Sequence, residues 1–180
     1  SDQLKLIRDM RRSLPFDTTL VVKEHPNLIG LKPIRFFREL RRIPNVRVIH
    51  PQVSTFDIYK RANLVFTVNG TTAYEAALLG IPAVLFAPGF FMEFDSVHVC
   101  EDLTALKPLV FRLLSDSRED KHAIVSAMDR ILRHSFRGYM TDPVSDPKVM
   151  DLQNLDELFV GFLDVTEHAR SGGRVDVACP

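Results

Sequence analysis

The sequence has few cysteines and no long apolar stretch. Its 180 residues include only two cysteines, Cys100 and Cys179, and no Cys-x-x-Cys pair. This spacing excludes a disulfide framework and a cysteine-based zinc site, and it predicts two free thiols in a reducing compartment. The longest apolar stretch, around residues 76–87, is interrupted by Gly80 and Pro82. A bilayer-spanning helix needs about 20 apolar residues, so none is expected, and the charged first residues lack a signal-peptide pattern.

Net charge is also missing, although each sign is concentrated in one part of the chain. The formal net charge is zero. Residues 1–50 contain 11 Lys and Arg against 5 Asp and Glu, whereas residues 140–180 contain 3 against 8. The basic first part indicates an anionic ligand or a charged partner surface. Nucleic-acid binding is not expected, because the chain as a whole is neutral.

Short apolar runs alternate with amphipathic segments along most of the chain. Strands are predicted at residues 18–23, 45–49, 64–68, 82–86 and 97–100, and helices at 2–13, 33–42, 54–62, 71–80, 103–114, 119–136 and 152–169. Strands that are apolar throughout are typical of parallel sheets buried on both faces. The pattern therefore predicts an α/β fold, a Rossmann-like doubly wound parallel sheet with helices on both faces.

One such domain is expected over residues 1–170, followed by a frayed tail at residues 171–180. The chain begins with Ser and enters a helical pattern at once. We therefore expect an N-terminal partner domain that lies outside this chain.

Ligands of doubly wound sheets bind at the carboxyl ends of the strands, so the exit loops are the places to seek a site. The first exit loop is Lys23-Glu24-His25-Pro26. A ring N–H of His25 can donate to a phosphate oxygen, Pro26 stiffens the turn, and Lys23 adds positive charge. The alternative is a loop histidine that merely satisfies a backbone carbonyl group.

The third exit loop runs through Asn69, Gly70, Thr71 and Thr72 into a helix. Free backbone N–H groups and two hydroxyls at a helix start suit an anion, and glycine permits close approach of the ligand. Glu75 can accept hydrogen bonds from a ribose or sugar hydroxyl. The alternatives are simple N-capping by the threonines and dipole stabilisation by Glu75.

Two further exit loops have weaker patterns. In the second loop, Pro51, Gln52 and Ser54 can place backbone groups against a nucleobase. Alternatively, this loop is a plain connector with a helix N-cap at Ser54 and an approximate capping box to Asp57. The fourth loop, residues 87–94, is aromatic and packs either on the missing domain or sugar, or on this domain's own core.

Several other patterns exclude common kinds of site. There is no phosphate-binding GxxxxGK[ST] sequence, no GxGxxG sequence and no GxSxG sequence, so a nicotinamide-type dinucleotide site is disfavoured. No metal is expected, because four histidines lack metal-ligand spacing: His98, His122, His134 and His168. Five arginines are expected to form a solvated surface: Arg35, Arg38, Arg41, Arg42 and Arg47.

Three segments together resemble a known family. They are residues 21–26 (VVKEHP), residues 44–49 (PNVRVI) followed by Ser54, and residues 69–86 (NGTTAYEAALLGIPAVLF). Their order and spacing resemble the C-terminal half of capsule polysaccharide biosynthesis proteins. These are glycosyltransferases built from two Rossmann-like domains (the GT-B type), and some of them transfer Kdo from CMP-Kdo. The similarity covers about residues 18–115.

The resemblance implies roles for individual residues. Bacterial sialyltransferases and their capsule relatives hold the CMP part of the donor with a His-Pro motif and a Ser/Thr pair. His25 and Pro26 match the motif, and Thr71 and Thr72 match the pair, where those enzymes often have serine. Such a family uses an inverting, metal-independent displacement, in which His25 would stabilise the leaving phosphate. The catalytic base usually lies in the N-terminal domain, so this chain alone is expected to be inactive.

The resemblance also implies partners and a location. The donor would be a CMP-activated sugar, with no further cofactor. A polysaccharide or glycolipid acceptor would bind through the missing domain. The full-length protein would be cytoplasmic, associated peripherally with the inner face of the cytoplasmic membrane.

Two alternatives remain open. One is a different GT-B enzyme, such as a relative of UDP-sugar 2-epimerases or a glycerophosphotransferase of the teichoic-acid type. The other is a non-catalytic Rossmann-like interaction module whose contact surface is the basic helix at residues 34–42.

Overall fold

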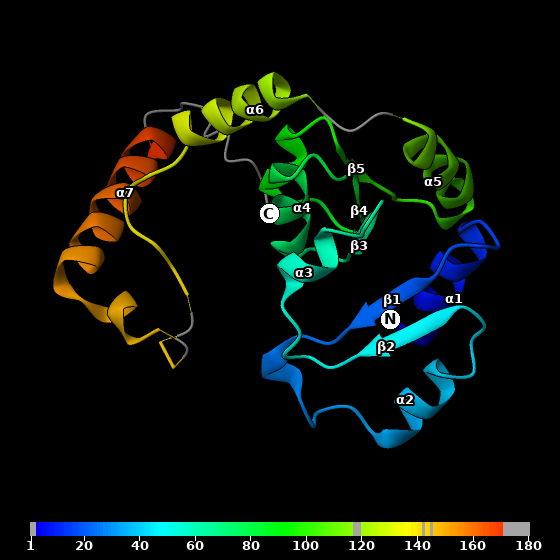
Figure 1. Cartoon of the computed structure of the whole chain (residues 1–180). Helices are drawn as coiled ribbons and strands as arrows, with labels where there is room; N and C mark the ends of the chain where they lie inside the picture. The colour runs from blue at the N-terminus through cyan, green and yellow to red at the C-terminus, as the bar shows by residue number, and fades with distance from the viewer. Residues whose placement is uncertain (1–2, 117–119, 142, 145, 171–180) are drawn as a thin grey trace.

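The computed structural model describes residues 3–116, 120–141, 143–144 and 146–170 (Figure 1). The strands are β1 (Leu20–Lys23), β2 (Val46–Ile49), β3 (Val65–Thr67), β4 (Ala83–Leu85) and β5 (Val97–Val99). The helices are α1 (Gln3–Ser13), α2 (Ile34–Leu40), α3 (Thr55–Tyr59), α4 (Thr72–Leu78), α5 (Leu106–Ser115), α6 (Lys121–Arg133) and α7 (Leu152–Arg170). Short 3-10 turns are η1 (Pro26–Leu28), η2 (Phe90–Glu93), η3 (Leu103–Ala105) and η4 (Pro147–Met150). Every predicted strand and helix within the described residues is present, with small shifts at its ends.

All described strand pairs are parallel, which confirms the predicted fold class. Strand β1 pairs with β2, and β3, β4 and β5 form a second sheet in that order. The chain therefore adds β2 on one side of β1. It then adds β4 and β5 beyond β3 in the opposite direction. In Figure 1, β1 lies on the side of its pair that faces the three-stranded sheet.

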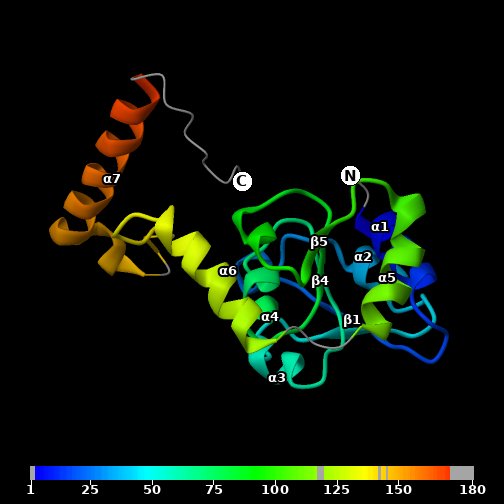
Figure 2. The ribbon, with the colours of Figure 1, turned by 90° about the horizontal axis from the view of Figure 1, so that it is seen from above.

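Helices cover both faces of the sheets (Figure 2). On one face, α3, α4 and α6 pack on β3, β4 and β5 around the buried residues Tyr59, Ile81, Leu85, Phe94 and Ala127. On the other face, α1 and α5 pack on side chains from β1 and β4 around Met10, Leu20, Val84, Leu106 and Val110. The second cluster joins the two sheets, because it contains residues from both.

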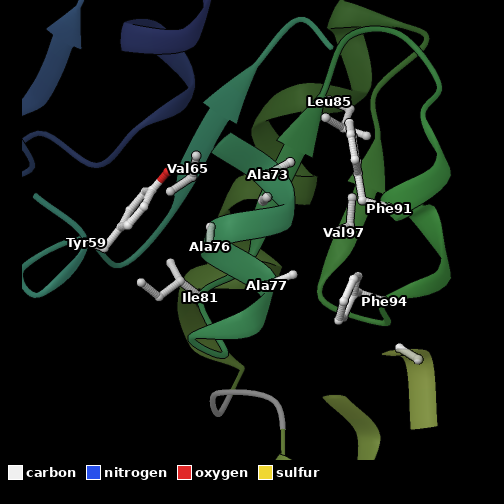
Figure 3. Packing of buried hydrophobic residues seen from close by; sticks show 12 residues of the cluster. Tyr59, Val65, Ala73, Ala76, Ala77, Ile81, Leu85, Phe91, Phe94 and Val97 are labelled. Atoms are coloured by element: carbon white, nitrogen blue, oxygen red, sulfur yellow. The ribbon is translucent and has the colours of Figure 1, made fainter. Parts of the chain in front are cut away.

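Helix α4 meets the sheet through alanine side chains. Ala73, Ala76 and Ala77 are fully buried and belong to one cluster with strand residues such as Val65 and Leu85 (Figure 3). Because alanine has no atoms beyond Cβ, the helix axis can lie close to β3 and β4. The helix ends before Gly80, which has a φ of 66°. The sequence predicted this terminal glycine, since a left-handed residue closes the last turn most easily without a side chain.

The aromatic loop after β4 belongs to the core of the domain. Phe91 and Phe94 are buried in the same cluster as the alanine face, and Tyr74 meets Phe94 edge-on, with the two ring centroids 5.9 Å apart. Of the two interpretations of this loop, packing on the domain's own core is therefore confirmed for these two residues.

The C-terminal helices extend away from the sheets. Helix α6 packs on η2, whereas α7 packs on η4 and on Phe136 and Gly138. Asn154 of α7 accepts a hydrogen bond from the Tyr139 N–H and donates to the carbonyls of Tyr139 and Val149. Both views show α7 beyond α6. The predicted tail at residues 171–180 lies outside the described residues.

The structure describes only one of the two cysteines predicted to be free thiols. Cys100 is free and buried, and burial, followed by the charge of Asp102, raises the pKa of its thiol. Cys179 lies outside the described residues. No helix among the described residues has the length and apolar content needed to cross a membrane.

Replacing Phe94 with alanine tests the importance of the aromatic loop. We expect Phe94→Ala to lower the free energy of unfolding by about 3–5 kcal/mol, because it leaves a cavity under α4. Met92 in the same turn is 48% exposed, so Met92→Ala should cost less than about 1 kcal/mol. Urea unfolding followed by circular dichroism measures both, and equal losses would contradict the assignment of Phe94 to the core.

Candidate ligand site at the carboxyl ends of the strands

Two His-Pro turns lie side by side at the ends of β1 and β2. The strands pair with Lys23 opposite Ile49, so the turns that begin at His25 and His50 leave neighbouring strands. In the first turn the Asn27 N–H donates to Nδ1 of His25 at 3.2 Å. In the second, the Gln52 N–H donates to Nδ1 of His50 at 3.3 Å. The same local contact therefore orients both rings.

This contact determines which ring nitrogen can donate. A neutral imidazole whose Nδ1 accepts a hydrogen bond carries its proton on Nε2. Both histidines are exposed, so the Nε2–H groups of His25 and His50 can reach a ligand. The alternative for His25, a ring that satisfies a backbone carbonyl, is not what the structure has, because the ring accepts from a backbone N–H.

The sequence analysis did not identify His50 as a site residue. The available signal was the repeated His-Pro dipeptide directly after a predicted strand. Of the predicted residues in that loop, Pro51 is half-buried, whereas Gln52 and Ser54 are exposed.

The predicted capping box in the second loop is wrong. Ser54 occupies the N-cap position of α3 but makes no side-chain capping hydrogen bond. Asp57 instead pairs with Lys60 at 2.7 Å, and that hydrogen bond, together with the lysine charge, lowers the pKa of its carboxyl group.

The Gly70–Thr72 loop presents unused donors. Thr71 is the N-cap residue of α4, yet its side chain makes no capping hydrogen bond, so the simple capping explanation does not hold for it. The hydroxyls of Thr71 and Thr72 and the backbone N–H groups of residues 70–72 contact no hydrogen-bond partner within the described residues. Because α4 has only seven residues, these groups, and not a long helix dipole, are what the loop offers an anion.

Glycines allow close contacts in the exit loops of β3 and β4. A Cβ atom on Gly70 would lie 2.8 Å from the Thr67 hydroxyl, and one on Gly89 would lie 2.9 Å from Oδ1 of Asn69. The predicted site residue Asn69 therefore contacts the fourth exit loop. A side chain at Gly70 would meet the end of its own strand, whereas one at Gly89 would meet Asn69 of the third exit loop and the Phe91 ring.

Glu75 is held by a tyrosine from the neighbouring helix. The Tyr59 hydroxyl lies 2.9 Å from Oε2 of Glu75 and 3.2 Å from the Thr72 carbonyl oxygen. Burial, and then the hydrogen bond to Glu75, raises the pKa of Tyr59. One carboxylate oxygen of Glu75 is therefore engaged within the protein, which leaves Oε1 as its available acceptor.

Glu24 carries an unsatisfied acceptor. Its Oε1 atom is buried and has no hydrogen-bond partner, although the residue lies between Lys23 and His25 in the first exit loop. A buried carboxylate oxygen without a donor is unfavourable, so a ligand hydroxyl or amine could satisfy it. The sequence offered no signal for this beyond its neighbours.

The predicted residues fall into separate groups. The two His-Pro turns form one group, and residues 69–75 with Tyr59 form another. Within the described residues, no hydrogen bond or ion pair joins the His-Pro turns to Asn69, Gly70, Thr71, Thr72 or Glu75. The part of the chain that the structure describes also contains no cluster of three or more His, Cys, Asp or Glu side chains that could hold a metal.

The fold and these loops define the class of protein: a Rossmann-like α/β domain with hydrogen-bond donors at the carboxyl ends of its strands. The model of the family described as protein of unknown function (DUF354) matches residues 26–137. The chain therefore belongs to this family. The match covers β2 to β5 and most of both loop groups, and it begins at Pro26, directly after His25. No curated protein sequence matches the chain, and no solved structure does.

Gly70→Ala tests the packing of the third exit loop. The new Cβ would meet the Thr67 hydroxyl, and since a β-branched side chain on a strand moves little, we expect a loss of about 1–3 kcal/mol in unfolding free energy. Removing the obstructing hydroxyl in Thr67→Ala/Gly70→Ala should restore part of this loss. Urea unfolding of the single and double variants measures the coupling, and strictly additive losses would contradict the contact.

Tyr59→Phe tests the contact with Glu75 through its pH dependence. The folded pKa of Tyr59 lies above the unfolded value of about 10, so its stabilisation is complete below pH 10 and is lost as the pH rises above that value. We expect the variant to lose about 1 kcal/mol at pH 7 and to show a shallower decline than the parent above pH 10. Unfolding free energies measured across this range check both, and parallel curves would refute the shift.

Proposed function

We propose that this chain is the donor-binding domain of an inverting, metal-independent glycosyltransferase in bacterial surface polysaccharide synthesis. The donor is a CMP-activated sugar such as CMP-Kdo. The observation that carries this proposal is the pair of His-Pro turns on neighbouring strands. Both histidines are exposed and accept a backbone N–H at Nδ1, which leaves Nε2–H for a ligand, and the unpartnered groups of residues 70–72 follow β3.

These groups suit a phosphate that gains charge. When the bond between the sugar carbon and the phosphate oxygen breaks, negative charge develops on the departing CMP. Fixed N–H and O–H donors lower the energy of that charge without a metal ion. In this proposal His25 and His50 donate to the phosphate from one side, and Thr71 and Thr72 donate from the other. The ligand joins the two groups of donors.

Glu24 is a better candidate than Glu75 for the ribose or sugar hydroxyls. Its buried Oε1 has no donor within the protein, whereas Oε2 of Glu75 already accepts from Tyr59. A ligand hydroxyl that donates to Glu24 would remove an unsatisfied buried acceptor. Lys23, which is half-buried at the end of β1, would contribute positive charge nearby.

The proposal assigns acceptor binding and proton removal to a second domain. The acceptor, a polysaccharide or glycolipid, and the base that deprotonates it would bind or lie in an N-terminal domain. The full-length enzyme would act in the cytoplasm at the inner face of the membrane, where such acceptors are made.

Calorimetric titration with CMP tests the donor site. His25→Ala and Thr71→Val should each raise the Kd for CMP by about tenfold or more, because each removes a hydrogen bond to a charged phosphate. His50→Ala should do the same. The controls are His122→Ala and Thr19→Val, since both residues lie away from these loops and His122 is exposed on α6.

Three results would count against the proposal. CMP affinity that is unchanged in His25→Ala and Thr71→Val would refute the phosphate assignment. Affinity that requires magnesium would refute the metal-independent mechanism. A clear preference for UDP over CMP would keep the domain as a nucleotide binder but favour an epimerase-like enzyme.

A further inference from the structure

Arginine side chains line two hollows along α1 and α2, together with the Glu39 carboxylate. A groove of about 730 Å³ between their ends is lined by Arg8, Arg11, Arg12, Phe16 and Arg42, among others. A second hollow of about 440 Å³ along α2 is lined by Ile34, Phe37, Arg38, Arg41 and Arg42. Because Arg42 lines both, the two hollows adjoin at this residue. We call Arg8, Arg12, Arg38, Arg41 and Arg42 the arginine face.

Most of its guanidinium groups are available to a partner. Arg38, Arg41 and Arg42 are exposed and make no side-chain hydrogen bond or ion pair within the described residues. Arg8 and Arg12 make single ion pairs at 3.5 Å and 3.4 Å with partly exposed carboxylates. Such surface pairs are weak, so an external anion can compete for both arginines.

Two large apolar side chains beside these arginines are exposed. Phe16 is 89% exposed and Ile34 is 75% exposed, although both line the hollows. The turn that carries Phe16 is held firmly. Arg11 donates to the carbonyls of Leu14, Pro15 and Phe16, and Asn45 Nδ2 donates to the Phe16 carbonyl at 2.7 Å. The backbone is therefore fixed in an arrangement that leaves the Phe16 ring in solvent.

We propose that the arginine face docks the chain onto an anionic lipid bilayer. Guanidinium groups match the phosphates of lipid headgroups, and exposed apolar side chains next to them enter the boundary between headgroups and acyl chains. The face shares no residue with the proposed donor site, so either proposal can fail alone.

Tryptophan fluorescence tests insertion. The chain has no tryptophan, so Phe16→Trp introduces a single reporter. Vesicles of phosphatidylcholine with about 30% phosphatidylglycerol should shift its emission to shorter wavelength, and brominated lipids should quench it. Val125→Trp is the control, because Val125 is 67% exposed on α6, and its emission should stay unchanged. An unshifted emission of the Phe16→Trp variant, or equal shifts in both variants, would overturn the proposal.

Charge-matched variants test the arginine face. Arg38→Gln/Arg41→Gln/Arg42→Gln should weaken sedimentation with the same vesicles more than about tenfold. The control Arg61→Gln/Lys121→Gln/Arg137→Gln removes equal charge from exposed positions outside α1 and α2, and it should change binding less than about twofold. Circular dichroism establishes that both variants fold. Equal losses, or equal binding of the parent to pure phosphatidylcholine, would overturn the proposal.

Inorganic phosphate distinguishes a bilayer from a free anion as the ligand. At equal ionic strength, phosphate and chloride should displace the chain from vesicles to the same extent, because the bilayer presents many headgroups to several arginines at once. Specific displacement by phosphate would assign the face to a soluble phosphate ligand and refute the bilayer.

Discussion

The close packing of α4 on β3 and β4 is the constraint on which the domain depends. Ala73, Ala76 and Ala77 are fully buried, so larger side chains there would push the helix off the sheet. Because the helix lies so near, its first residues, Thr71 and Thr72, stand directly beyond the end of β3. The same packing brings α3 alongside, so that Tyr59 reaches Glu75. The packing of the alanines thus positions the two threonines, although Thr71 makes no capping hydrogen bond.

Strand pairing positions the two His-Pro turns, just as helix packing positions the two threonines. Each histidine is oriented within its own turn, by the N–H of the residue two positions later. The parallel register of β1 and β2 then places the two turns together. The two groups of donors therefore come from two separate sheets, which share an apolar cluster on the opposite side of the strands from α4. A ligand that contacts both groups would bridge the sheets at the point where the winding of the chain reverses, the usual site in such folds.

The uneven charge of the chain becomes a spatial separation in the fold. Basic side chains gather on the outer surfaces of α1 and α2, whereas Asp156, Glu157, Asp164 and Glu167 lie on α7. The five arginines predicted to face solvent are exposed. Local sequence showed only their solvation, while the fold placed three of them, on α2 and directly after it, along a groove and an adjoining hollow.

Periodicity and turn residues alone determined the order of elements, the parallel fold class, the terminal glycine of α4 and the loops at the strand ends. These depend on neighbours within a few residues, so a single sequence contains them. Only the tertiary structure decided that Phe91 and Phe94 belong to the core, that Tyr59 holds Glu75, that Glu24 buries an unpaired oxygen and that His50 stands beside His25. Asp57 differs from these cases, because it pairs with its local neighbour Lys60 instead of the capping box expected from its spacing. Each of these outcomes depends on which of several possible partners comes within contact distance, and packing between segments remote in sequence sets most of those distances.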